Sequence, residues 1–500
     1  MSLKKITAIH PFLFAAAPIV FLWSHNSQKV EFVELLLPAL VSVGACALLL
    51  GVLWLVSRDW ARTAATVSLL LLLFFGYGHL FELIWSWNFF QNVFVAHLVL
   101  GIYLAVFFAG TIAAVWRARN IEQLTVFFTI APAVILLISP VTIFSQVLAT
   151  YEKQPEVVVE PVLNVVADPR QAQPKAAEPM PDIYYIILDS YSRADSLKQL
   201  YGYDNSSFID FLKSRGFYIA DQSFSNYPNT IYSLSSSLNL HYLKDGMNEN
   251  QLLKMLREPL IARYLQSKGY RYVHFNTFAS ETRKSDIADV TYDYTPLLGR
   301  EFTRILLRTT LLSGLEKYGP TRLLAEHTLY LFDNAGEIPH ISAPTFTLAH
   351  FFPPHHPFIF DSSGNYIGDD QPMTVPTQNV RSLYVDQLIF MNDRTKLLID
   401  QLLKRSSTPP IIIIQGDHGG GYMTSGRAKE WDRLGILNAY YVPENYRQEL
   451  YNTITPVNSF RLLVKSCFNE NLKRLPDVSY VVKDEKFVKS EVAARGNDRP

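Results

Sequence analysis

The chain has 500 residues, a formal net charge of zero and 49% hydrophobic residues. A neutral charge balance gives no indication of nucleic-acid binding, and the length allows more than one domain. The hydrophobic residues are concentrated in about the first 150 positions, whereas the remainder has the composition of a soluble protein. The composition therefore predicts a membrane domain followed by a soluble domain.

Five apolar stretches precede this change in composition. A helix needs about 20 residues to cross a bilayer, and each stretch is close to that length. We expect a five-helix transmembrane domain over residues 1–148, with helices at Ile6–Trp23, Leu35–Val56, Thr63–Ile84, Val93–Val115 and Leu124–Leu148.

Basic residues are unevenly distributed over the loops that join these stretches. One side of the predicted membrane domain has only Lys29, and the other has Lys4, Lys5, Arg58, Arg62, Arg117 and Arg119. The positive-inside rule places the N-terminus in the cytoplasm and everything after Leu148 outside. The sequence thus predicts a multi-pass inner (plasma) membrane protein with an extracytoplasmic C-terminal domain.

Three ionisable residues lie near the outer ends of the third and fourth stretches. His79 and Glu82 are three residues apart on one helical face, and His97 begins the next stretch on the same side. Such groups are costly within a bilayer and are often functional. They either meet a lipid headgroup or form a hydrogen-bonded pair between helices.

Residues 149–180 are expected to form a linker, because proline recurs there among Ala, Val, Gln and Glu. A soluble domain is expected over residues 181–484, and a charged tail over 485–500. Cys46 and Cys467 fall in different domains, so no disulfide is expected between them.

The soluble domain alternates strand and helix patterns. Alternation of this kind predicts an α/β fold, in which helices sandwich a mostly parallel central sheet and sites form at the carboxyl ends of strands. Strands are expected over Pro181–Ser190, Gly269–Phe275, Thr345–His350 and from Ile411, and helices over Ser206–Ser214, Pro259–Ser267 and Arg381–Arg405.

Polar residues follow two of these strand patterns and begin one further helix. Asp189 ends the first strand, Asp417 and His418 follow the Ile411 strand, and Thr230 lies near the start of a helix. Carboxylates and an imidazole suit a divalent metal. A helix start offers amide donors and a positive dipole to a phosphate. The alternatives are a helix cap at Thr230 and a capped turn at Asp417 and His418.

At these residues the chain resembles the alkaline phosphatase/sulfatase superfamily, and most closely its membrane branch, which includes lipoteichoic acid synthase and the phosphoethanolamine transferases. The resemblance covers roughly residues 181–465. It implies that Asp189, Thr230, Asp417 and His418 bind a catalytic metal and that Thr230 is the nucleophile. A similar His-x-Pro-Phe segment in that branch implies substrate-facing histidines in the segment 349–358, first His355 and second His350.

The resemblance also bears on the cofactor. Two-metal relatives use another histidine downstream of the Asp-His pair, whereas this chain has no histidine after His418. We therefore expect one divalent ion, Mn²⁺ or Mg²⁺, with Zn²⁺ also compatible with the imidazole. The sequence from Thr230 does not match the Cys/Ser-x-Pro-x-Arg motif of formylglycine sulfatases, which argues against sulfate-ester hydrolysis.

We expect a metal-dependent phosphotransferase or phosphodiesterase that acts on envelope lipid or glycan head groups through a phospho-threonine intermediate. One alternative is a sulfatase-like phosphatase or sulfuric ester hydrolase of small esters. Another is a catalytically inactive envelope scaffold. Arg193, four residues after Asp189, either clamps phosphate or forms an exposed salt bridge.

Overall fold

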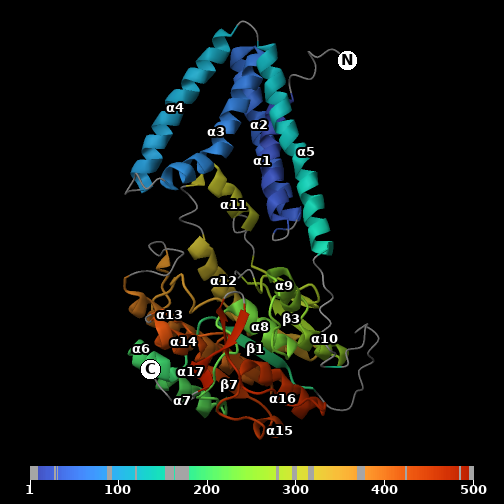
Figure 1. Ribbon diagram of the computed structural model, residues 1–500, viewed down its shortest axis with the longest axis vertical. Coiled ribbons are helices and arrows are strands. Elements are labelled where there is room, and N and C mark those ends of the chain that lie inside the picture. Colours follow the sequence, from blue (N-terminus) through green and yellow to red (C-terminus); the bar gives the residue numbers. More distant parts are fainter. Residues whose placement is uncertain are drawn as a thin grey trace. The chain divides into compact units, whose positions relative to one another are not determined.

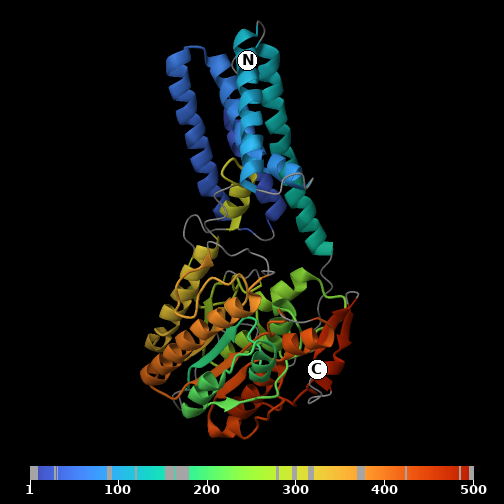
Figure 2. The ribbon, with the colours of Figure 1, turned by 90° about the vertical axis from the view of Figure 1, so that its left-hand side faces the viewer.

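The computed structural model describes residues 9–27, 30, 32–86, 93–118, 121–152, 163, 180–277, 281–294, 301–313, 320–368, 378–422, 425–483 and 486–494. The chain divides into two compact units (Figures 1 and 2). The first comprises Met1–Val158 and Thr295–Pro320, and the second comprises Val159–Tyr294 and Thr321–Pro500. Most of the linker expected at 149–180 lies outside the described residues.

The first unit contains a helix at each of the five apolar stretches. They are α1 (His10–Asn26), α2 (Phe32–Ser57), α3 (Trp60–Ser86), α4 (Val93–Arg117) and α5 (Glu122–Glu152). Of the described helices, α2, α3, α4 and α5 are long and apolar enough to cross a membrane. Helix α1 has 17 residues, or about 26 Å of rise.

Helix α1 packs against its neighbours through polar as well as apolar contacts. Nδ1 of His10 lies 2.7 Å from the hydroxyl of Ser68 on α3. The hydroxyl of Ser42 on α2 donates to the carbonyl oxygen of Ala15, at 2.8 Å. These contacts join α1 to the same bundle as the longer helices.

A mostly parallel sheet forms the centre of the second unit, as predicted. Its order among the described residues is β2-β7-β6-β1-β5-β3-β4. Only β7 against β6 and β2 against β7 pair antiparallel. The strands are β1 (Ile183–Leu188), β2 (Tyr218–Ile219), β3 (Arg271–Phe275), β4 (Val290–Tyr292), β5 (Thr345–Phe351), β6 (Ile411–Gln415) and β7 (Asn438–Tyr441).

Both faces of this sheet are covered, because successive residues of β1 enter two separate hydrophobic cores. Ile186 and Leu188 belong to one core, and Ile183 and Ile187 belong to the other. A sheet buried on both faces explains the unbroken apolar runs of β1 and β6. The covering helices thus sandwich the sheet as expected.

The helices that follow α5 along the chain are mostly short. They are α6 (Ala194–Leu200), α7 (Ser206–Ser214), α8 (Thr230–Asn239), α9 (Glu249–Arg257), α10 (Leu260–Ser267), α11 (Glu301–Thr309), α12 (Pro320–Ala335), α13 (Val380–Arg405), α14 (Gly426–Leu434), α15 (Glu444–Arg447) and α16 (Pro456–Phe468). Helix α11 belongs to the first unit, although it lies in the middle of the soluble domain in sequence.

The C-terminal segment also has regular structure. Strands β8 (Tyr480–Lys483) and β9 (Lys486–Lys489) form an antiparallel hairpin, and α17 (Glu491–Ala494) follows it. The rings of Tyr480 and Phe487 pack against Tyr227, with ring centroids 5.4 and 5.0 Å away. The segment predicted as a charged tail over 485–500 therefore contributes β9, whose side chains pack beside the start of α8.

Candidate active site

Two neighbouring strands carry the acidic residues of the site. Strand β1 pairs parallel with β6, with Ile187 opposite Gln415. Asp189 directly follows β1, and Asp417 comes two residues after the end of β6. Both side chains are almost fully buried. The carboxyl ends of adjacent parallel strands thus bring the two carboxylates together, as the strand patterns predict.

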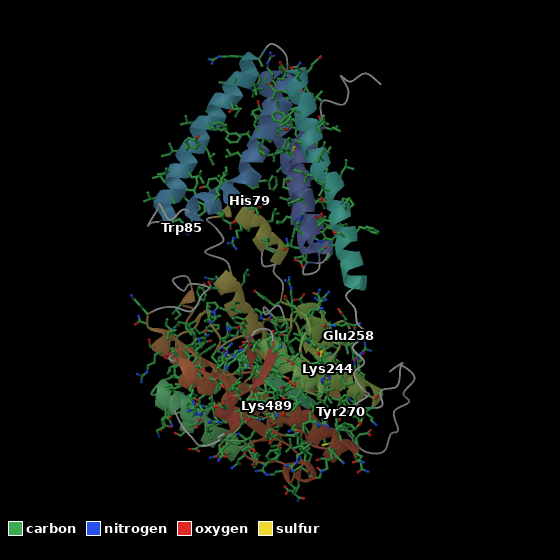
Figure 3. The ribbon with its side chains drawn as sticks, in the orientation of Figure 1. His79, Trp85, Lys244, Glu258, Tyr270 and Lys489 are labelled. Carbon is green, nitrogen blue, oxygen red and sulfur yellow. The ribbon has the colours of Figure 1, made fainter. Side chains whose placement is uncertain are left out.

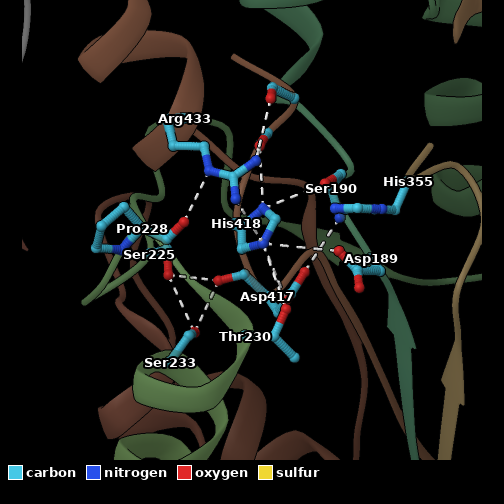
Figure 4. A network of polar contacts seen from close by, with 12 residues as sticks. Asp189, Ser190, Ser225, Pro228, Thr230, Ser233, His355, Asp417, His418 and Arg433 are labelled. Atoms are coloured by element: carbon cyan, nitrogen blue, oxygen red, sulfur yellow. Dashed lines mark hydrogen bonds and ion pairs between the residues drawn. The ribbon is translucent and has the colours of Figure 1, made fainter. Parts of the chain in front are cut away.

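The side chains of Asp189, Thr230 and Asp417 converge on one ring nitrogen of His418 (Figure 4). This Nε2 lies 3.6 Å from Oδ1 of Asp189, 3.4 Å from Oδ2 of Asp417 and 3.4 Å from the hydroxyl of Thr230. The other ring nitrogen, Nδ1, donates to the carbonyl oxygen of Gly419 at 3.0 Å. Nε2 therefore presents a lone pair to the carboxylates and the hydroxyl, as a metal-binding histidine does.

The charges of the two carboxylates oppose each other at close range. Burial raises the pKa of Asp417 to about 7, and the charge of Asp189 adds to this effect. Burial also favours protonation of Asp189, but the neighbouring His355, His350 and His418 outweigh it and lower the pKa of Asp189. The site therefore holds two buried carboxylates that a cation would stabilise in their charged forms.

The donor set fits a divalent metal ion. The ligand atoms of Asp189, Asp417 and His418 all lie within 4.8 Å of one another. Oδ1 of Asp189 and Oδ2 of Asp417 are buried, and neither has a hydrogen-bond partner among the described residues. These are the two carboxylate oxygens that face Nε2 of His418. A cation bound between them would satisfy both unpaired buried oxygens and the imidazole lone pair.

Thr230 is the first residue of α8, after Asn229 in extended conformation. Its position at the helix start was predicted, and it is 9% exposed. Ser233, nearly one turn later, instead donates to the carbonyl oxygen of Asp417 at 2.7 Å. Ser225 donates to that same oxygen at 2.5 Å. The helix therefore directs one hydroxyl into the cluster and uses another to hold the backbone of a ligand residue.

Ser190 holds the turn after β1 in a conformation that L-residues rarely adopt. Its φ is +62°, and its backbone N–H donates to Oδ1 of Asp417 at 3.1 Å. Its hydroxyl lies 3.3 Å from Nδ1 of His418. A left-handed residue that is not glycine costs of order 1 kcal/mol or more, so this turn is held in place by its neighbours. Neither contact was predicted from the sequence.

The two histidines expected to face substrate occupy different environments. His350, on β5, is 1% exposed; its Nε2 lies 3.4 Å from Oδ2 of Asp189, and its Nδ1 lies 2.6 Å from the hydroxyl of Thr282. The pKa of His350 is lowered by burial, but Asp189 outweighs this and raises it overall. His355 is half-buried, and its ring centroid is 6.3 Å from that of His418. His350 therefore contacts a carboxylate of the cluster, whereas His355 lies beside the cluster.

Arg433, on α14, is a site residue that the sequence reasoning missed. Its Nη2 lies 3.2 Å from Nε2 of His418, and its Nε donates to the carbonyl oxygen of Pro228 at 2.7 Å. Its Nη1 donates to the carbonyl oxygens of Gly419 and Gly420. The guanidinium thus joins the loop before α8 to the loop after β6. Arg433 lies in a helix with no recognisable motif, so its sequence does not indicate a role in the site. Only the tertiary fold brings the two loops that it contacts together.

Arg193 forms a salt bridge and is not part of the cluster. Its Nε lies 2.8 Å from Oδ1 of Asp195, and its guanidinium lies 4.4 Å from the ring centroid of Phe224. Of the two interpretations left open for Arg193, the structure has the salt bridge, although the arginine is buried and not exposed.

Two of the three ionisable residues predicted near the outer ends of α3 and α4 have defined partners. Glu82 forms an ion pair with Arg308 of α11, at 2.7 Å. The ring of His97 stacks on Phe81, with centroids 3.7 Å apart, and lies 3.0 Å from the hydroxyl of Tyr77. His79 is exposed near the C-terminal end of α3, where Figure 3 labels it together with Trp85. Contacts between helices therefore account for Glu82 and His97.

Comparisons with solved structures found chains that are similar to this one. The C-terminal periplasmic domain of EptC from Escherichia coli is 13% identical, with 63% of this chain and 94% of that chain covered and a TM-score of 0.43. The lipoteichoic acid synthase LtaP from Listeria monocytogenes is 14% identical, with 63% and 82% covered and a TM-score of 0.42. The lipooligosaccharide phosphoethanolamine transferase A from Neisseria meningitidis, an integral membrane protein, is 12% identical, with 93% and 97% covered and a TM-score of 0.42.

No curated protein sequence matched the chain. The profile of the sulfatase family matches residues 181–453, more than half of the chain. That range includes β1 to β7 and every residue of the cluster around His418. The chain therefore belongs to the sulfatase family and is a sulfatase-like enzyme.

Proposed function

We propose that this protein is a metal-dependent phosphotransferase or phosphodiesterase with Thr230 as its nucleophile. The observation that carries the proposal is the convergence of one helix-start hydroxyl with two buried carboxylates and an imidazole lone pair. A hydroxyl in that position is next to both the cation ligands and the amide groups at the start of α8. The arrangement suits attack on a phosphate ester.

Asp189, Asp417 and His418 would hold one divalent ion together with the oxygen of Thr230. When bound, such an ion lowers the pKa of a hydroxyl and neutralises phosphate oxygens. The identity of the ion is proposed from ligand chemistry as Mn²⁺ or Mg²⁺, with Zn²⁺ compatible with the imidazole. His350, buried against Asp189, would orient that carboxylate, a role that suits its burial better than contact with substrate.

In the proposed reaction Thr230 is the nucleophile and His355 is the proton donor. The hydroxyl of Thr230 loses its proton to water, and its oxygen forms a bond to phosphorus as the bond from phosphorus to the leaving oxygen breaks. His355, beside the cluster and half-buried, would donate a proton to that leaving oxygen. Water, or the hydroxyl of an acceptor, would next give a proton back to His355 and attack phosphorus, while the bond from phosphorus to the oxygen of Thr230 breaks and that oxygen takes up a proton from water. Whether water or an acceptor enters decides between hydrolysis and transfer.

We further propose that substrate and acceptor are envelope lipid or glycan head groups. The sequence joins the sulfatase-family domain to a unit with four helices suited to crossing a membrane. The five apolar stretches favour five spans, and the distribution of basic residues favours a cytoplasmic N-terminus and an extracytoplasmic site. A membrane-anchored enzyme acts on molecules in or near that membrane, and head groups linked by phosphodiesters match the chemistry of Thr230.

Turnover by variants at Thr230 tests the proposal. The purified full-length protein, supplied with Mn²⁺, is expected to cleave bis(p-nitrophenyl) phosphate and to leave p-nitrophenyl sulfate largely intact. Thr230→Ala should abolish cleavage, while Thr230→Ser should retain part of it because a hydroxyl remains. Ser236→Ala is the matched control, since Ser236 lies on the same helix and donates to the carbonyl oxygen of His241, away from the cluster.

Three results would contradict the proposal in different ways. Cleavage of the sulfate ester in preference to the phosphodiester would favour a sulfuric ester hydrolase. Absence of both metal binding and turnover would favour an inactive scaffold. Normal turnover by Thr230→Ala would leave the enzyme class open but make the nucleophile assignment wrong.

A further inference from the structure

One segment of the soluble domain's sequence is part of the helical unit. Residues Thr295–Pro320 belong to the compact unit of α1–α5, although the chain on both sides of them belongs to the sheet-containing unit. The described part, residues 301–313, contains α11 and the turn after it. The chain therefore returns to the helical unit after it has formed β1, β3 and β4.

Helix α11 is docked on the bundle by an apolar face. Phe302 and Leu306, one turn apart, are buried in a cluster with Ile19 of α1, Leu35 of α2 and Phe75 of α3. Residues four apart lie on the same face of a helix, so one stripe of α11 makes this contact. A helix of nine residues is too short to be stable alone, so the docking contacts are what hold it in place.

Polar contacts fix both ends of α11. The backbone N–H of Phe302, at the helix start, donates to Oε2 of Glu34, which is 9% exposed. Arg308, in the last turn, donates to Oε1 of Glu82 at 2.7 Å. A carboxylate at the N-terminal end and a cation at the C-terminal end both suit the helix dipole. Residues at the two ends of α11 thus form polar contacts with α2 and with α3.

The backbone of α11 lies close to the bundle at Gly78 of α3. A Cβ atom at Gly78 would lie 2.0 Å from the carbonyl oxygen of Arg308 and 2.7 Å from Cα of Thr309. Both are backbone atoms, which cannot move aside without displacing the helix. At Gly76, two residues earlier, a Cβ atom would meet nothing within 4 Å. Gly78 is therefore specifically required for the docked position.

The turn after α11 presents two leucines on the surface of the helical unit. Leu311 is 49% exposed and Leu312 is 38% exposed. The backbone N–H of Leu311 donates to the carbonyl oxygen of Phe74, at 2.8 Å, so the turn lies directly against α3. The turn with its exposed leucines thus lies directly against a helix that is long and apolar enough to cross a membrane.

We propose that residues 301–313 form a second membrane-attachment element, in which α11 docks on α1–α3 and Leu311 and Leu312 contact the lipid of the bilayer. The partner is lipid because the turn that carries these leucines lies against a helix suited to crossing a membrane. Single exposed leucines on a soluble domain need no partner, but a pair at the edge of a transmembrane surface meets acyl chains or the headgroup boundary.

This attachment would limit how far the sheet-containing unit can move from the bilayer. Eight residues separate Tyr292 at the end of β4 from Glu301 at the start of α11, and fully extended they span about 30 Å. The 30 residues between α5 and β1 would by themselves allow roughly 100 Å. If the proposed function holds, the shorter connection favours lipid head groups over glycan distant from the membrane.

Spin labelling of the full-length protein tests lipid contact without using turnover. Cys46 and Cys467 are replaced by alanine, and a nitroxide is attached at Leu311→Cys in nanodiscs of phosphatidylethanolamine and phosphatidylglycerol. The label should collide more with dissolved oxygen than with the water-soluble complex Ni-EDDA. Leu40→Cys, on the exposed face of α2, is the lipid-facing control, and Leu397→Cys, 56% exposed on α13, is the aqueous control. A label at residue 311 with the collision ratio of the label at residue 397 would overturn the proposal.

Docking of α11 is tested with the two glycines of α3. Gly78→Leu should reverse the collision ratio of the label at residue 311 towards Ni-EDDA, whereas Gly76→Leu should leave it unchanged. An unchanged ratio in Gly78→Leu would show that the docked position is wrong. If Gly78→Leu does not fold, the ratio at residue 311 in the otherwise unaltered chain still decides lipid contact. Loss of activity at Thr230 variants would have no effect on either measurement, so the two proposals fail independently.

Discussion

Replacement of Asp417 by asparagine should remove metal binding and at the same time relieve a repulsion in the metal-free protein. The facing ligand atoms of Asp189 and Asp417 lie within 4.8 Å of each other. At that separation and an effective dielectric constant of about 20, two negative charges repel by about 3 kcal/mol. This repulsion is fully present only above the pKa of Asp417, which is about 7, so unfolding is compared on the alkaline side of that pKa. Asparagine is similar in size, and its amide oxygen can still accept from the backbone N–H of Ser190. The metal-free variant should therefore be no less stable than the metal-free wild type.

Thermal unfolding of the full-length protein, with chelator and with Mn²⁺, measures both effects. The wild type should be stabilised by Mn²⁺, by about 2.7 kcal/mol when the ion is at 100 times its Kd. Asp417→Asn should show no shift with Mn²⁺ and should unfold at or above the wild-type temperature in chelator. Metal content measured by mass spectrometry should fall to background in the variant.

Asp432→Asn is the matched control for this experiment. Asp432 is equally buried, but its oxygens accept from the hydroxyls of Ser192 and Tyr201 and from the N–H of Gly421. Its replacement should destabilise the protein with or without metal and should preserve the shift with Mn²⁺. The reasoning would be refuted if Asp417→Asn kept the full Mn²⁺ shift, or if it were as unstable in chelator as Asp432→Asn.

Other expected outcomes concern Arg433, the C-terminal hairpin and the membrane topology. Arg433→Met should lower kcat at least about tenfold, because two loops of the site lose a shared donor, and bound metal should persist in elemental analysis. Phe487→Ala should lower the free energy of unfolding of the sheet-containing unit by about 2 kcal/mol in denaturant titration, since its ring packs on Tyr227. Alkaline phosphatase fusions after Leu148 should be active, whereas fusions near Asn120 should be inactive; an inactive fusion after Leu148 would place the site in the cytoplasm.

The strands that carry the site were predictable because their patterns are local. Ile411 to Ile414 form an apolar run that is typical of a strand buried on both faces, and Asp417 comes three residues after its end. Helices α7 and α13 were likewise predicted to within one residue at each end. In each case the signal lies in the spacing of apolar residues along a single element.

The features that the sequence did not predict depend on which elements meet in space. Arg433 reads as an ordinary helix-surface cation, and only the packing of α14 beside the loops after β6 and before α8 gives it four partners. Helix α11 has an amphipathic pattern that suits any soluble domain, so its place with α1–α3 could not be inferred. The positive φ of Ser190 has no sequence signal either, since serine, unlike glycine, does not mark such a turn.

Trapping of the covalent intermediate tests the central claim most directly. The full-length protein is mixed with a phosphodiester substrate and Mn²⁺, quenched in acid within the first turnover and digested for peptide mass spectrometry. The account predicts a phosphate-bearing adduct on Thr230 that is absent from Thr230→Ala and from samples prepared with chelator. An adduct on Ser233 or on another residue, with Thr230 unmodified, would contradict it.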